Sequence, residues 1–101
     1  MAYKLKFTQI FNKADQEAFL AIEKKFIELE HTDPTLVKGK RYVPVFGREA
    51  TNTLIWEADF PALEDAVAML KKLEQSAGHD ALLEEQIGYM KDYYMEILKE
   101  L

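Results

Sequence analysis

The alternation of hydrophobic and polar residues from Tyr3 to Phe11 predicts that the chain opens with a β-strand. Successive side chains of a strand point to opposite faces, so a period of two marks one buried and one exposed face. After this segment, hydrophobic residues recur every three or four positions, which is the spacing of a helix with one buried stripe. Asn12 or Asp15 can cap this helix, and Asp33-Pro34 ends it, because a residue before proline is disfavoured in helical conformation. The stripe contains Phe19, Ile22, Phe26 and Leu29.

Two further strands, joined as a hairpin, are predicted in the middle of the chain. The segment Tyr42 to Arg48 is rich in β-branched and aromatic residues but contains Pro44, which has no N–H to donate to a neighbour. This strand should therefore lie at an edge of the sheet. Gly47 to Asn52 supplies turn-forming residues, and Thr53 to Phe60 then alternates as the third strand. Its apolar face contains Leu54, Trp56, Ala58 and Phe60.

The remaining pattern predicts a second helix and leaves the C-terminal segment open to two interpretations. Pro61 suits the first turn of the helix, which runs toward Gly78 with Leu63, Ala66, Val67, Leu70 and Leu73 as its stripe. From Asp80, apolar residues recur at steps of four and three, which by periodicity predicts one helix to the end. The tract Tyr93 to Leu98 also has strand propensity. It could complete a four-stranded sheet, with helical structure ending near Lys91.

Composition and charge narrow the class of protein. The hydrophobic fraction of 49%, with four Gly and three Pro, is typical of one folded domain, here residues 1–101, and not of a disordered segment. The absence of cysteine excludes disulfides and thiol catalysis. A net charge of -5 argues against a nucleic-acid partner. No apolar run approaches the ~20 residues of a membrane span, and Lys4 and Lys6 interrupt any signal-peptide core, so we expect a cytoplasmic protein without a membrane partner.

The second face of the predicted sheet mixes apolar and ionisable side chains. It includes Lys6, Thr8, Ile10, Ile55 and Glu57. A wholly exposed face would be more polar, and a dry core would not accept Lys6 and Glu57 without partners. We therefore expect a partly covered surface. A second copy of the sheet could cover it and enclose a cavity.

The β-α-β-β-α order, the edge strand and the run NTLIWEADFPALEDA resemble the dimeric α/β-barrel superfamily, and its NIPSNAP-like branch in particular. Gly47-Arg48-Glu49 and the segment Asn52 to Glu57 carry the resemblance. It implies an α+β, ferredoxin-like fold with helices on one face, and a homodimer in which two subunits pack sheet to sheet. The superfamily includes monooxygenases, isomerases and dehydratases. None of their catalytic motifs matches here, so no catalytic residue is carried over.

Arg48, Glu57 and Tyr42 are the candidate ligand-binding residues. A hairpin could bring Arg48 and Glu57 across strands as a charge pair, either a structural salt bridge or part of a pocket. In a pocket, Arg48 could hold a carboxylate or phenolate and Glu57 could accept a proton, with Tyr42 as a phenol donor. His79 has no cysteine or second histidine nearby, so we expect no metal site. No cofactor motif is present, and we expect no cofactor.

Two functions are compatible with these patterns. The first is a small-molecule-binding barrel, in its fullest form a cofactor-independent enzyme acting on an aromatic or oxygenated metabolite. The second is a non-enzymatic homodimeric interaction or assembly module. A cavity of roughly 300 Å³ or more with converging polar groups would favour the first function, and a filled interface would favour the second.

Overall fold

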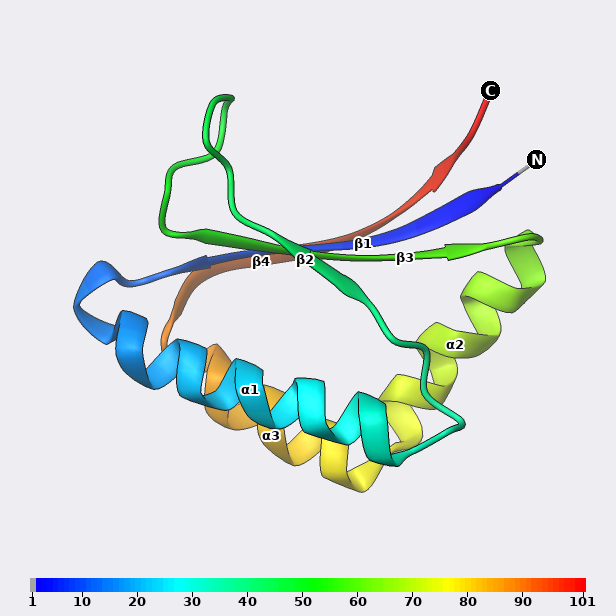
Figure 1. The fold of residues 1–101 in the computed structure, drawn as a ribbon, viewed down its shortest axis with the longest axis horizontal. Helices are drawn as coiled ribbons and strands as arrows, with labels where there is room; N and C mark the ends of the chain where they lie inside the picture. The colour runs from blue at the N-terminus through cyan, green and yellow to red at the C-terminus, as the bar shows by residue number, and fades with distance from the viewer. Residues whose placement is uncertain (1) are drawn as a thin grey trace.

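The computed structural model describes residues 2–101 and contains a four-stranded antiparallel sheet with helices on one face (Figure 1). The strands lie in the order β2-β3-β1-β4. This is the predicted α+β, ferredoxin-like arrangement, which is thereby confirmed. The elements are β1 (Tyr3–Phe11), the 3-10 helix η1 (Lys13–Asp15), α1 (Gln16–Thr32), β2 (Lys40–Tyr42), β3 (Thr53–Phe60), α2 (Leu63–Gln75), α3 (Ala77–Ile87) and β4 (Met90–Lys99).

The second strand is shorter than predicted and lies earlier in the chain. It spans Lys40–Tyr42, and residues 43–52 form a loop instead of the predicted extension to Arg48. Pro44 cannot donate a ladder hydrogen bond, and Gly47 has a φ of 148°, which a strand does not accommodate. The expected edge position of this strand is confirmed, because β2 pairs with β3 alone.

The C-terminal segment forms a fourth strand, so the prediction of one helix to the end is wrong and the competing interpretation is confirmed. Helix α3 ends at Ile87, and β4 pairs with β1 along almost its full length. The free edge of β1 offers a row of backbone partners to a segment rich in tyrosine, and these outweigh an apolar spacing that also fits a helix. The helix predicted to reach Gly78 ends at Gln75, and Ser76 caps α3 by accepting a hydrogen bond from His79 N at 3.3 Å.

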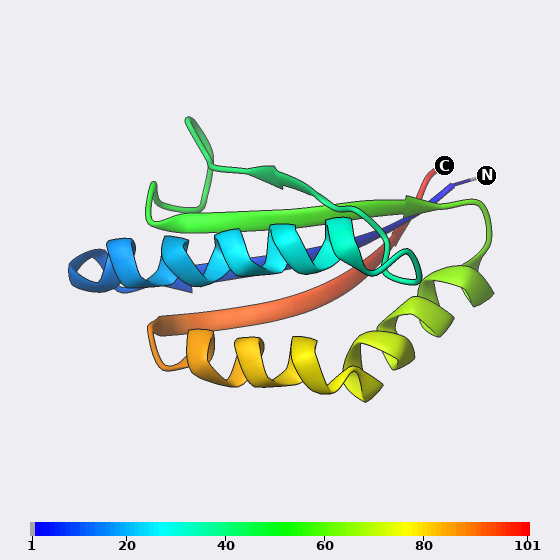
Figure 2. The ribbon, with the colours of Figure 1, turned by 60° about the horizontal axis from the view of Figure 1, so that its bottom comes forward.

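The strand register decides which side chains face the helices, which all lie on one side of the sheet (Figure 2). Phe7 lies opposite Trp56 on β3 and Met95 on β4, and Arg41 on β2 lies opposite Trp56. All four residues therefore share the helix-facing side. The core on this side consists of two clusters: Leu5, Trp56, Ala58, Phe60 and Ala66 form one, and Phe11, Phe19 and Leu54 form the other.

The opposite side of the sheet, which we call the open face, is not covered by a helix of the described residues, and the loop 43–52 rises above it (Figure 1). Lys4 on β1 and Glu57 on β3 form an ion pair here, with Nζ 2.8 Å from Oε1. Val45 and Phe46 in the loop are 97% and 100% exposed. Within residues 2–101, none of the helices combines the length and the apolar character that crossing a membrane requires.

Candidate functional site

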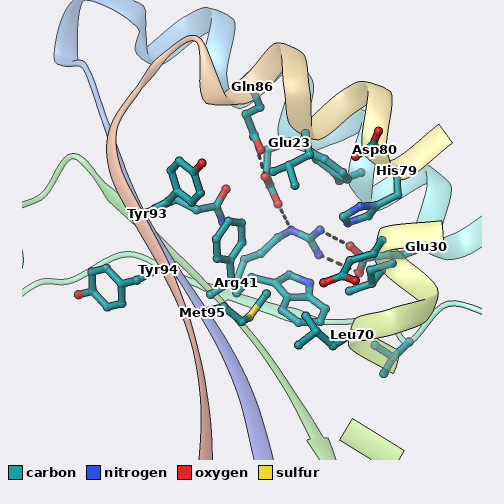
Figure 3. Close-up of a pocket in the computed structure, with 18 residues that line it drawn as sticks. Glu23, Glu30, Arg41, Leu70, His79, Asp80, Gln86, Tyr93, Tyr94 and Met95 are labelled. Atoms are coloured by element: carbon teal, nitrogen blue, oxygen red, sulfur yellow. Dashed lines mark hydrogen bonds and ion pairs between the residues drawn. The ribbon is translucent and has the colours of Figure 1, made fainter. Parts of the chain in front are cut away.

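A cavity of about 450 Å³ lies between the sheet and the helices (Figure 3). It borders the first of the two core clusters, because Trp56 belongs to that cluster and also lines the cavity. On β1, Leu5 and Phe11 belong to different clusters, whereas Phe7 and Gln9 between them line the cavity. The cavity therefore lies against the middle of β1 on the helix-facing side of the sheet.

A buried polar network forms one wall of the cavity. Arg41 Nε donates to Glu23 Oε2 at 2.5 Å, and both terminal nitrogens of Arg41 donate to the carboxylate of Glu30 (Figure 3). Gln86 Nε2 donates to Glu23 Oε1 at 2.9 Å. The Arg41 side chain is 15% exposed, and those of Glu23 and Glu30 are 8% and 10% exposed. This network joins β2, α1 and α3 through charged groups that are largely removed from water.

The charges of this network depend on one another. Burial disfavours the charged form of Arg41, but its hydrogen bonds to Glu30 and Glu23 outweigh burial, so the pKa of Arg41 is raised. Glu30 is held further by the backbone of Gly39, whose N–H donates to Oε1 at 2.8 Å. Two carboxylates therefore share one guanidinium. Losing that guanidinium would leave both of them uncompensated.

His79 borders the cavity from the first turn of α3 (Figure 3). Its ring packs against Phe26, with the ring centroids 4.9 Å apart. Burial lowers the pKa of His79, although the carboxylates of Glu30, Asp80 and Glu23 oppose this shift. The imidazole is therefore neutral at pH 7 and can accept a proton.

The rest of the wall is mainly apolar, and its open side lies along β4. Tyr93 and Met95 line the cavity from this strand and are 46% and 36% exposed. Trp56 forms part of the wall and packs tightly on the backbone of Gly39, where an added Cβ would lie 1.8 Å from Trp56 Nε1. Among residues 2–101, no group of three or more His, Asp or Glu side chains is placed to hold a metal ion.

Solved structures share this architecture, although no family profile and no curated protein matches the sequence. A NIPSNAP family protein from Agrobacterium tumefaciens has a TM-score of 0.77 at 12% identity, over 99% of this chain and 86% of that one. The fold is that of NIPSNAP proteins. An uncharacterized NIPSNAP domain protein from Burkholderia xenovorans has a TM-score of 0.71 at 12% identity, over 100% and 95% of the two chains.

A solved structure that is not described as a NIPSNAP protein has the same fold. A putative antibiotic biosynthesis monooxygenase from Nitrosomonas europaea has a TM-score of 0.72 at 13% identity, over 99% of this chain and 90% of that one. The predicted resemblance is therefore confirmed for the fold. At such identities the shared shape does not establish an activity.

Within this NIPSNAP-like fold, the three residues singled out from the sequence lie on or above the open face. Arg48 is exposed in the loop 43–52 and borders an open-face hollow of about 640 Å³. Glu57 pairs with Lys4, and no Arg48–Glu57 ion pair forms among residues 2–101. Tyr42 ends β2, opposite Ile55, and is 48% exposed. The three side chains do not line one common cavity, and a ligand-binding role for them stays a prediction.

The residues of the buried network were not singled out from the sequence. Arg41 follows Lys38 and Lys40 in a basic segment typical of a solvated loop, yet the short strand β2 turns this side chain toward the helices. A signal for the carboxylates was present, because Glu23 lies four residues after Phe19 and Glu30 lies four residues after Phe26. Both therefore belong to the buried stripe of α1. A carboxylate at such a position requires a buried partner, and only the fold identifies it as Arg41.

Proposed function

We propose that this chain is a small-molecule-binding protein whose ligand occupies the cavity between the sheet and the helices. The cavity volume of about 450 Å³ falls within the range usual for ligand sites. The observation that carries the proposal is the position of the buried network of Arg41, Glu23, Glu30 and Gln86, which supplies fixed polar groups to a mainly apolar wall. Such a combination binds the body of a ligand by burial and orients it by its polar groups.

Calorimetric titration with phenethyl alcohol, a small neutral aromatic probe, tests this proposal. We expect binding that Leu83→Trp weakens, because Leu83 lines the cavity and a larger side chain there would occupy part of it. Leu82→Trp, at a neighbouring position of α3 outside the lining, should leave binding unchanged. Equal affinity of the two variants would contradict the proposal.

A more specific form of the proposal is a cofactor-independent enzyme acting on an aromatic or oxygenated metabolite. It is supported by the neutral imidazole of His79 beside the cavity, which can take a proton from a bound substrate. A protein named a putative antibiotic biosynthesis monooxygenase also has this fold. Mass spectrometry of products formed from a panel of phenols would detect turnover. We expect it to be lost in His79→Gln and retained in the exposed control His31→Gln.

We propose further that the chain acts as a homodimer packed through its open faces. Support comes from exposed apolar side chains on or above that face, since large apolar patches mark contact surfaces. These are Tyr42, Val43, Val45, Phe46 and Leu98. Light scattering should give a mass near twice the 11.7 kDa of the chain. A monomer would contradict the dimer, whereas a dimer that binds no probe would point to the assembly module instead.

A further inference from the structure

From the charges that line the cavity between the sheet and the helices, we infer that its ligand is an organic cation, an apolar or aromatic body bearing a protonated amine. The inference rests on the proposed function, because both place the ligand in the same cavity. It goes further by assigning the sign of the ligand's charge.

The ionisable groups of the wall are mostly acidic. Four carboxylates line the cavity, and one guanidinium, that of Arg41, opposes them. His79 adds no positive charge at pH 7, because burial lowers its pKa despite the carboxylates that face it. Three negative charges therefore remain in excess (four less one), and an anionic ligand would add to them. The carboxylates are those of Glu23, Glu30, Glu74 and Asp80.

Arg41 is poorly placed to receive an anion. Its Nε donates to Glu23, one terminal nitrogen donates to Glu30 and to the carbonyl of Gly39, and the other donates to Glu30. A ligand carboxylate would have to displace an internal carboxylate from this arrangement. The displaced group would then be buried without a counter-ion, which is costly.

Glu23 is better placed to receive a cation. Each of its oxygens accepts one protein hydrogen bond, from Arg41 and from Gln86, while an ionised carboxylate can accept about four. Glu30 has less capacity left to accept a hydrogen bond, since it already accepts one from Gly39 and two from Arg41. An ammonium group at Glu23 would therefore gain a charge-assisted hydrogen bond without breaking the network.

Aromatic side chains complete a site suited to a cation. Phe26 on α1, Trp56 on β3 and Tyr93 on β4 line the same cavity. The negative faces of aromatic rings attract a cation, and the rings also bury the apolar body of the ligand. Asp80 and Glu74 are exposed parts of the lining, where they favour the approach of a positive charge.

The test compares three aromatic probes of similar size and different charge: phenethylammonium, phenethyl alcohol and hydrocinnamate. Trp56 is the only tryptophan of the chain and lines the cavity, so its fluorescence reports occupancy. We expect the cation to bind at least about tenfold more tightly than the alcohol, and the anion to bind most weakly. Raising the salt concentration should weaken the binding of the cation alone.

Variants assign the preference to the cavity wall. Glu23→Gln should reduce the affinity for phenethylammonium by about tenfold more than the affinity for phenethyl alcohol, because it removes a negative charge from the wall and nearly keeps the size of the side chain. Asp80→Asn, an exposed substitution that does not touch the buried network, should reduce the affinity for the cation more modestly. Glu85→Gln, on α3 outside the cavity lining, is the matched control and should change neither affinity.

The outcomes separate the two proposals. If the alcohol or the anion binds in the cavity as tightly as the cation, the assignment of charge is overturned and the proposed binding function stands. If Glu23→Gln and Asp80→Asn bind the cation as the unmodified chain does, the assignment is overturned as well. If none of the three probes changes the fluorescence of Trp56, and calorimetry detects no binding of any of them, the binding function and the assignment both fail.

Discussion

Arg41 compensates two buried carboxylates, so a neutral residue in its place leaves Glu23 and Glu30 without a counter-ion. We expect Arg41→Met to lower the free energy of unfolding by about 3–5 kcal/mol, because a broken buried ion pair costs that much. Lys40→Met, at the exposed neighbouring position of β2, should change it by less than about 0.5 kcal/mol. Urea denaturation measures both. A loss for Arg41→Met as small as that for Lys40→Met would show that the network does not stabilise the fold.

His79 should make the stability of the protein depend on pH below about 6.5. Because burial lowers its pKa in the folded state, the unfolded state takes up a proton first as the pH falls from the ordinary histidine value of about 6.5. Stability is therefore lost on acidification. Its neighbours Glu30, Asp80 and Glu23 favour protonation and limit the loss.

Denaturation as a function of pH tests this effect by comparison of variants. His79→Gln cannot take up the proton, so its stability should fall less steeply below about pH 6.5 than that of the unmodified chain. His31→Gln removes the other, exposed histidine and should follow the unmodified chain. Identical profiles for His79→Gln and the unmodified chain would contradict the assigned role of burial.

At the scale of the elements, the first turn of α3 depends on the side chain of Ser76. Ser76 separates it from α2 and accepts a hydrogen bond from His79 N through its hydroxyl oxygen. We expect Ser76→Ala to lower the free energy of unfolding by about 1 kcal/mol, and Ser76→Asp, which also caps helices well, to preserve it. Thermal unfolding of the two variants measures the difference. Equal losses would show that the cap is not the cause.

How far the sequence predicts these elements depends on how local their causes are. The ranges of β1 and β3 and the end of α1 at Asp33-Pro34 follow from alternation and from proline, which act within a few residues. The end of α2 and the nature of β4 do not follow in this way. The apolar spacing after Asp80 fits a helix as well as a strand, and the free edge of β1 decides between them.

The candidate site was less predictable than the fold for the same reason. Arg41 is separated from Glu23 by 18 residues, and Gln86 is separated from Glu23 by 63. Their meeting depends on the packing of β2, α1 and α3, which no local pattern encodes. The mixed composition of the second sheet face predicts a partly covered surface, and the structure of one subunit shows that its polar residues are paired in part with one another, as Lys4 is with Glu57.

For the whole molecule, the loop 43–52 offers a way to separate dimerisation from folding. Val45 and Phe46 are almost fully exposed, so replacing both by serine should leave the stability of one subunit unchanged. If the open faces pack together, the loop lies at that contact, and the double variant should weaken the dimer by at least about tenfold. Light scattering over a range of concentrations measures this.

The matched control for the loop variant lies on the helical layer. Leu63, at the start of α2, is also an exposed apolar residue, at 43%, and Leu63→Ser should leave the dimer unchanged. Weakening by Leu63→Ser but not by the loop variant would place the contact on the helices instead of the open face.

The division of the core into two clusters has a consequence for how the molecule opens. Because the cluster around Leu5 and the cluster around Phe19 share no residue, each can lose its packing without directly exposing the other. Amide hydrogens of β1 near Leu5 and near Phe11 should then exchange with solvent at different rates, as two local opening units within one continuous strand. A molecule bound in the cavity would contact the first cluster through Trp56, and it should slow exchange near Leu5 more than exchange near Phe11.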